Sequence, residues 1–177
     1  FRYLAAHIDR ASARVDFDFE LAGPSRTEVF RETVTFTPVR ADRDVDWLRV
    51  EGLVAILGAV IGLSYYKAAA PQRYVISQGG ITAAGVSYLT TVLSKGLAEF
   101  AFRNDLPGLL EPEIVLTGGV SPEFPAESHV TPDGDPLVPI GGGKDSVVTV
   151  ELLAAARMHP VQFAVNPNQV IFRVGRV

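Results

Sequence analysis

The glycine-rich segment at residues 141–146 constrains the fold most, because it lies between an apolar run at 136–140 and an amphipathic run at 147–158. This order predicts a strand, a tight turn and a helix. Glycine adopts backbone angles closed to other residues and has no Cβ to hold a ligand away. Successive amide N–H groups at such a turn can converge on an anion, and the helix dipole adds to the attraction. We therefore expect a site for phosphate or pyrophosphate, formed by Gly141, Gly142, Gly143, Lys144, Asp145 and Ser146.

The spacing within this loop excludes two common phosphate-binding motifs. A Walker A loop, G-x-x-x-x-G-K-[ST], would need a Gly at Val138 and a Ser or Thr at Asp145. The dinucleotide motif G-x-G-x-x-G would need its third Gly at Ser146. A tight turn followed by a helix capped by Asp145 or Ser146 is the structural alternative to a ligand site.

The residues after the loop favour the ligand site. The apolar segment Val161–Val165 predicts a second strand, so a strand, a loop, a helix and a strand follow one another as in a parallel crossover unit. Ligands of open parallel sheets bind at the carboxyl ends of the strands. The glycine-rich loop lies at that end.

The N-terminal region alternates apolar and polar side chains, which is typical of half-buried strands. Runs at Val15–Leu21 and Val29–Val39, with a third at Phe1–Ile8, predict an antiparallel meander. One face of the run Val15–Leu21 carries an acidic row of Asp16, Asp18 and Glu20. We interpret this row as a solvated face and not as a metal site.

Two longer segments predict helices. Trp47–Tyr66 is strongly apolar, and its uncharged part, Leu53–Leu63, is well short of the roughly 20 residues that cross a bilayer. We expect a buried helix whose glycines allow another backbone to approach closely, and no membrane insertion. Ile81–Asn104 predicts a long amphipathic helix, and Arg73–Gln78 a short strand between the two helices.

The first helix ends in the segment Ser64–Pro71, which combines two phenols, a hydroxyl and one of the few lysines. In the structural interpretation, Tyr65 and Tyr66 are edge residues of a core helix, and Lys67 is a solvated cation favoured by the helix dipole. In the functional interpretation, Tyr66 and Lys67 contribute to a reaction. Both interpretations are open at this point.

The region at 107–135 is rich in Pro, Gly and acidic residues, which indicates a connection with a short strand or turn near Ile114–Leu116. We therefore expect an N-terminal α+β domain at 1–106, with antiparallel strands and two long helices, and a second domain that begins at 136. Val170–Val177 predicts a further strand. Residues 136–177 supply fewer elements than a complete nucleotide-binding sheet needs, so we expect an incomplete α/β domain.

Composition narrows the function classes. A net charge of −4 without a basic run argues against nucleic acid as the main partner. The absence of cysteine excludes disulfides, thiolate catalysis and thiolate metal sites. The three histidines are isolated and lack metal-ligand spacing. No secretory signal is visible, so we expect a cytoplasmic protein, and the chain begins at Phe1, which hints at a fragment.

Two resemblances add to these expectations. The loop resembles the Ser-Gly-Gly-x-Asp-Ser pyrophosphate loop (PP-loop) of the ATP pyrophosphatase superfamily, with Gly141 in place of the Ser. This change removes one hydroxyl contact to phosphate. The segments Ser64–Pro71, Gly96–Asn104 and Pro139–Val148 together resemble the UDP-N-acetylmuramoyl-L-alanyl-L-glutamate epimerase family of bacterial peptidoglycan synthesis. Members of that family are longer than this chain.

The resemblance implies a PP-loop (adenine nucleotide alpha hydrolase-like) domain that begins at 136. It also implies a reaction with ATP and Mg²⁺ that releases AMP and pyrophosphate while the terminal L-Glu of UDP-MurNAc-L-Ala-L-Glu becomes D-Glu. The loop would bind the nucleotide, Asp145 would be a ligand of Mg²⁺, and Lys67 and Tyr66 are the candidates for proton transfer. The alternatives are another adenylating ligase or amidotransferase of the superfamily, and a non-catalytic fragment that acts as a binding module.

Overall fold

The computed structural model describes residues 1–36, 45–124 and 135–175. Contacts divide the chain into two compact units, Phe1–Pro125 and Ala126–Val177. Each unit is described by itself.

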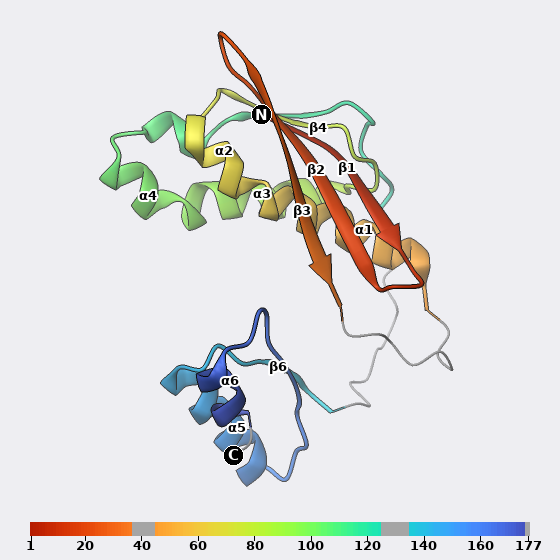
Figure 1. Cartoon of the computed structure of the whole chain (residues 1–177), viewed down its shortest axis with the longest axis vertical. Coiled ribbons are helices and arrows are strands. Elements are labelled where there is room, and N and C mark those ends of the chain that lie inside the picture. The colour runs from red at the N-terminus through yellow and green to blue at the C-terminus, as the bar shows by residue number, and fades with distance from the viewer. Residues whose placement is uncertain (37–44, 125–134, 176–177) are drawn as a thin grey trace. The chain divides into compact units, whose positions relative to one another are not determined.

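The first unit contains a five-stranded mixed sheet with the strand order β3-β2-β1-β4-β5 (Figure 1). Its strands are β1 (Arg2–Asp9), β2 (Arg14–Ala22), β3 (Thr27–Thr35), β4 (Arg73–Ile76) and β5 (Glu113–Leu116). The first three strands pair in antiparallel fashion, which confirms the predicted meander. β4 joins β1 in parallel, and β5 joins β4 in parallel. The strand near Ile114–Leu116 thus belongs to the sheet of the first unit, although we had expected it within a connection.

The period-two pattern of β2 separates the two faces of this sheet. Val15, Phe17 and Phe19 are buried in the core, whereas Asp16 and Asp18 lie on the opposite face. The apolar residues of β2 share a core with residues of the described helices, an arrangement that is common in antiparallel strands with one solvated face.

The helical elements of the first unit are α1 (Trp47–Ile61), α2 (Leu63–Ala69), α3 (Ala83–Thr91), the π-helical turn η1 (Val92–Gly96), α4 (Ala98–Arg103) and the 3₁₀ turn η2 (Pro107–Leu110). The single helix expected at Ile81–Asn104 is therefore a helical segment with a π-turn and a break at Leu97, whose backbone leaves helical angles (φ −99°, ψ 4°). Thr82 begins this segment, because its hydroxyl accepts a hydrogen bond of 3.1 Å from the N–H of Gly85.

Glycines let α1 lie close to the sheet, as the sequence predicted. A Cβ at Gly58 would overlap the Tyr3 phenol and the Phe17 ring, and a Cβ at Gly62 would lie 2.7 Å from the Tyr74 hydroxyl oxygen. Trp47–Ala69 has the length and the mean hydropathy, 1.6, of a membrane span. In this unit, however, Ala55 of that segment is fully buried in the hydrophobic core. These contacts are those of a core helix.

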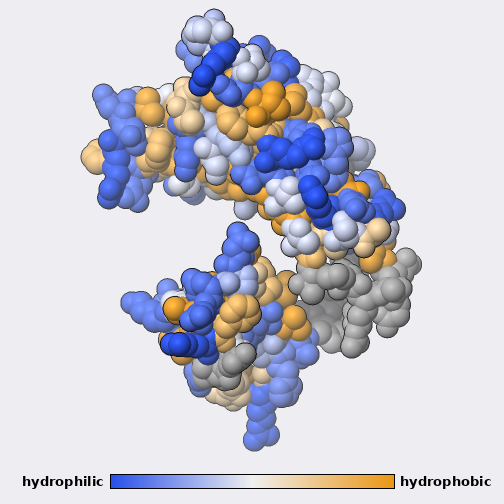
Figure 2. All heavy atoms as spheres, viewed as in Figure 1, coloured by the Kyte–Doolittle hydropathy of each residue, from blue (hydrophilic) through white to orange (hydrophobic). Residues whose placement is uncertain are grey.

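The second unit is small. It contains β6 (Leu137–Pro139), α5 (Lys144–Ala155), β7 (Val161–Phe163) and α6 (Gln169–Val174). β6 and β7 pair in parallel, which confirms the predicted crossover unit. Among its described residues, only Val138, Ile140 and Val150 form a buried core, and large apolar side chains such as Leu152 and Val165 are exposed. Figure 2 shows hydrophobic side chains at the surface of this unit.

The prediction of a strand at Val170–Val177 was wrong, because residues 169–174 form the helix α6. The Asn168 side chain begins this helix by accepting hydrogen bonds from the N–H groups of Val170 and Ile171. Ile171 and Val174, three positions apart, then face the same core. The β-branched residues suggested a strand, but the cap and the packing of one helical face decided otherwise.

Candidate functional site

The glycine-rich loop joins the end of β6 to α5. Gly142 has φ of +81°, in the left-handed region that favours glycine, and a Cβ there would lie 3.0 Å from Ile171. At Gly141 and Gly143, no atom of the described residues lies within 4 Å of the position of a Cβ, apart from the adjacent residues. Two of the three glycines therefore leave open space at the loop surface.

The start of α5 differs from the predicted cap. Gly143 is the N-cap, and neither Asp145 nor Ser146 caps the helix with its side chain. The Ser146 hydroxyl instead accepts a hydrogen bond of 3.1 Å from the N–H of Gly141. Ser146 thus closes the loop from within the first turn of the helix, and the capping prediction for Asp145 and Ser146 was wrong.

The residues of this loop fit a phosphate group and a magnesium ion in their chemistry. The first N–H groups of a helix have no partner within the helix, and here the helix begins at Lys144. The side chains of Lys144 and Asp145 are exposed. Phosphate binds to ammonium groups and to the free N–H groups at a helix start, and Mg²⁺ binds to carboxylates.

The Ser64–Pro71 segment lies in the first unit, where α2 carries both tyrosines. Tyr66 is fully buried, and its phenol donates a hydrogen bond of 2.9 Å to the backbone carbonyl of Leu109. Burial raises the pKa of Tyr66 to about 12. Lys67 is partly buried, and its Nζ lies 5.7 Å from the centre of the Phe100 ring. Lys67 and Tyr66 are thus in one unit, and the glycine-rich loop is in the other.

Tyr65 makes a second polar contact of this segment. Its phenol donates a short hydrogen bond to the carboxylate of Glu32 on β3, and this bond raises the pKa of Tyr65 to about 12. Its ring stacks on Phe30 with centroids 4.3 Å apart. Tyr65 therefore joins α2 to the edge of the sheet.

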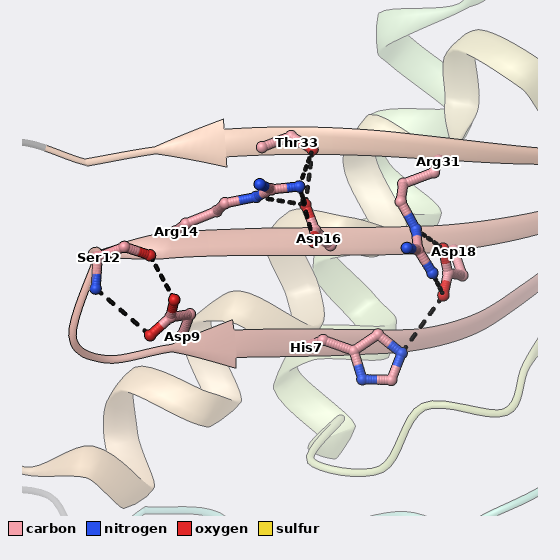
Figure 3. A network of polar contacts seen from close by, with 8 residues as sticks. All are labelled: His7, Asp9, Ser12, Arg14, Asp16, Asp18, Arg31 and Thr33. Carbon is pink, nitrogen blue, oxygen red and sulfur yellow. Dashed lines mark hydrogen bonds and ion pairs between the residues drawn. The ribbon is translucent and has the colours of Figure 1, made fainter.

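The acidic row of β2 is covered by cations (Figure 3). Arg31 donates two hydrogen bonds to Asp18, of 2.6 and 2.8 Å, and Arg14 binds Asp16 in the same bidentate way. The hydrogen bond from Arg31 holds the pKa of Asp18 below its usual value. Within the described ranges, no group of three or more His, Asp and Glu side chains is arranged to hold a metal ion.

Sequence reasoning missed a cleft of about 790 Å³ in the first unit. It lies beside the second half of β1, and its walls include Arg10, Gln78, Gly79 and Phe124. The Gly79-Gly80 pair after β4 was the available signal, because glycines in or near a strand often mark a place where a ligand or another backbone approaches closely.

The two units define a class of protein in which an α+β unit with a mixed sheet precedes a small parallel strand-loop-helix-strand unit. The chain belongs to the family described as the MurL N-terminal domain, whose model matches residues 1–177. No solved structure matches the chain.

Three relatives carry the name UDP-N-acetyl-alpha-D-muramoyl-L-alanyl-L-glutamate epimerase. The protein of Micromonospora sp. is 39% identical over 175 residues, which is 98% of this chain and 38% of the relative. That of Salinispora tropica is 36% identical over 174 residues, 97% of this chain and 37% of the relative. That of Xanthomonas oryzae pv. oryzae is 32% identical over 125 residues, 69% of this chain and 26% of the relative. The matched residues thus span between about a quarter and little more than a third of the length of these curated relatives.

Proposed function

We propose that this chain is part of a cytoplasmic enzyme that converts the terminal L-Glu of UDP-MurNAc-L-Ala-L-Glu to D-Glu, with ATP and Mg²⁺, in peptidoglycan precursor synthesis. The observation that carries the proposal is identity of 39% and 36%, over nearly the whole chain, to proteins named as that epimerase. The glycine-rich loop supports the part of the proposal that concerns ATP.

The weak acidity of the α-proton explains why the reaction would need ATP. Removal of the α-proton beside a carboxylate would place a second negative charge next to the first. Transfer of AMP from ATP to the carboxylate forms an acyl-adenylate and releases pyrophosphate. The carbonyl of the acyl-adenylate is uncharged, so it can accept the negative charge that forms as the α-proton is removed. Return of a proton on the opposite face, followed by hydrolysis of the adenylate, yields D-Glu and AMP.

We assign the binding of the pyrophosphate end of ATP to the loop. Gly141 and Gly143 leave room beside the backbone, and Lys144 brings a positive charge to the first turn of α5. Mg²⁺, held by Asp145 and phosphate oxygens, would shield the charge of the leaving pyrophosphate.

For the proton-transfer pair we propose Lys67 and Tyr66. A phenol whose pKa is raised to about 12 is protonated at neutral pH, so Tyr66 would donate a proton and would not remove one. Lys67 would then be the base. Because Tyr66 also bonds the carbonyl of Leu109, its substitution must be read together with the stability of the protein.

The test is an incubation of the full-length protein with ATP, Mg²⁺ and UDP-MurNAc-L-Ala-L-Glu, in which AMP and D-Glu are both measured. We expect both products, and we expect Asp145→Ala to abolish both. AMP without D-Glu, formed only when ammonia or an amine is present, would identify an adenylating ligase instead. The absence of both products would contradict the proposal. Full activity of Asp145→Ala would show that the loop takes no part in the mechanism.

A further inference from the structure

The cleft of the first unit has the volume of a small-molecule site. At about 790 Å³ it falls within the roughly 300–1,000 Å³ that is usual for such sites. One wall is formed by Ala6 and Ile8 of β1 together with Arg10, and another by Leu48 and Glu51 of α1. All of its lining residues belong to the first unit.

The wall along β1 is an open strand edge. β1 pairs with β2 as far as Asp9↔Arg14, but in the described residues its pairing with β4 stops at Tyr3↔Ile76. Beyond that point, the N–H of Ala6 donates a hydrogen bond of 2.7 Å to the side-chain carbonyl of Gln78. The backbone of Ala6 therefore points toward the cleft. Since backbone direction alternates along a strand, Ile8 presents its own N–H and C=O to the same side.

Gln78 shows what this edge binds. Its side chain is a primary amide, and it takes the place that a peptide group of a neighbouring strand would occupy beside Ala6. An extended ligand with its own amide could continue this pairing at Ile8, as in recognition by strand addition. The opposite side has space for such a ligand, because a Cβ at Gly79 would meet no atom of the described part of the chain within 4 Å.

Arg10 is the group of the cleft that can bind a carboxylate. The guanidinium lies 4.3 Å from the centre of the Trp47 ring and binds Glu51 through Nη2 at 3.0 Å. These contacts orient a group that has five N–H donors. The other acid of the cleft, Glu123, accepts a hydrogen bond of 2.8 Å from the N–H of Ala84 at the start of α3. Arg10 is the one cation among the lining residues, and the N–H groups that do not bind Glu51 are the donors that a carboxylate could reach.

We propose that this cleft binds the L-Ala-L-Glu part of the substrate in an extended form, with its amide paired to the edge of β1 at Ile8 and a carboxylate on Arg10. This inference rests on the proposed function for the identity of the peptide. It adds a peptide-binding site in the first unit, separate from the glycine-rich loop. Neither Lys67 nor Tyr66 lines the cleft, so binding of the dipeptide there during the reaction would exclude both as the proton-transfer pair.

The experiment measures binding without catalysis, so that its result does not depend on the epimerase assay. Full-length protein is mixed with N-acetyl-L-alanyl-L-glutamate, and amide hydrogen exchange is followed by mass spectrometry in peptides that cover residues 5–10. We expect slower exchange there, because strand addition protects the N–H of Ile8. N-acetyl-L-alanyl-L-lysine amide, whose only charge is the side-chain ammonium, is the probe of opposite charge, and we expect it to give less protection.

Two variants test the walls of the cleft. Arg10→Gln should raise the Kd of the acidic dipeptide about tenfold, the loss expected for one hydrogen bond to a charged group. Leu48→Glu changes a side chain that is 69% exposed, so it should fold normally and weaken the same probe by placing a negative charge at the cleft. Arg26→Gln is the control, because Arg26 pairs with Glu28 in the turn between β2 and β3, away from the cleft.

Unchanged exchange at residues 5–10 with saturating acidic dipeptide would overturn the proposal, even in a protein that makes D-Glu. Equal Kd values for wild type, Arg10→Gln and Leu48→Glu would also overturn it, as would stronger binding of the lysine probe. Conversely, protection of Ile8 in a protein without epimerase activity would leave the peptide site intact and remove only the proposed function.

Discussion

The Tyr66 phenol donates a buried hydrogen bond of 2.9 Å to the backbone carbonyl of Leu109, and so joins α2 to η2. The Tyr3 phenol lies in the same core but has no hydrogen-bond partner in the described part of the chain. These two tyrosines offer a matched pair of Tyr→Phe variants.

Tyr66→Phe should lower the free energy of unfolding by roughly 1–3 kcal/mol, because it leaves a buried carbonyl without its partner. Tyr3→Phe removes a hydroxyl that bonds nothing, so its effect should be near zero or stabilising. Urea unfolding of both variants measures the difference. A Tyr66→Phe protein as stable as wild type would contradict the structural role of this bond. If that variant kept its fold and lost D-Glu formation, a catalytic role of Tyr66 would gain support.

The stability of the first unit should fall in alkaline solution. Burial raises the pKa values of Tyr3, Tyr66 and Tyr74 above the value of about 10 in an unfolded chain. A group whose pKa is raised by folding contributes stability that is fully present below the unfolded pKa and is lost as the pH rises through the folded pKa. Urea midpoints should therefore decrease from about pH 10 to pH 12. A flat profile over that window would show that the phenols are not buried as described.

Gly58→Ala should destabilise the protein although alanine is the better helix former. The added methyl group would overlap the rings of Tyr3 and Phe17, and overpacking of a core costs roughly 1–3 kcal/mol. Gly96→Ala is the control, because a Cβ there would meet only Val92 at 3.5 Å. That variant should have unchanged or higher stability in thermal unfolding. Equal melting temperatures for the two variants would contradict the close approach of α1 to the sheet.

The ion pair on the outer face of the sheet should affect stability in acid. The hydrogen bond from Arg31 lowers the pKa of Asp18, so the carboxylate contributes stability above the unfolded value near pH 4 and loses it as the pH falls through the folded pKa. Asp18→Asn should cost at most about 1 kcal/mol at pH 7 and should make the acid profile less steep. Glu99→Gln, in an exposed pair on α4, is the control. An unchanged acid profile in Asp18→Asn would contradict the role of this pair.

Two glycines of the loop should behave differently. Gly142→Ala should destabilise the second unit by roughly 1–2 kcal/mol, because φ of +81° strains any residue with a Cβ. Gly143→Ala, at φ of −90° and in open space, should leave stability within about 0.5 kcal/mol of wild type. In the full-length protein, however, Gly143→Ala should raise the KM for ATP, since its methyl group would project where the phosphate approaches. An unchanged KM would show that phosphate does not bind here.

Local patterns in the sequence determined the antiparallel meander, the buried helix with its close-packed glycines, and the strand-loop-helix-strand order around the glycine-rich loop. Each depends on neighbouring residues alone, since alternation, helical spacing and glycine content act over a few positions. Tertiary structure decided the parallel pairing of β1, β4 and β5, because strands far apart in sequence carry no local sign of their partner. It also decided that residues 169–174 form a helix, that the Tyr66 hydroxyl bonds Leu109, and that the edge of β1 borders a cleft. These features arise from contacts between segments that only the folded chain brings together.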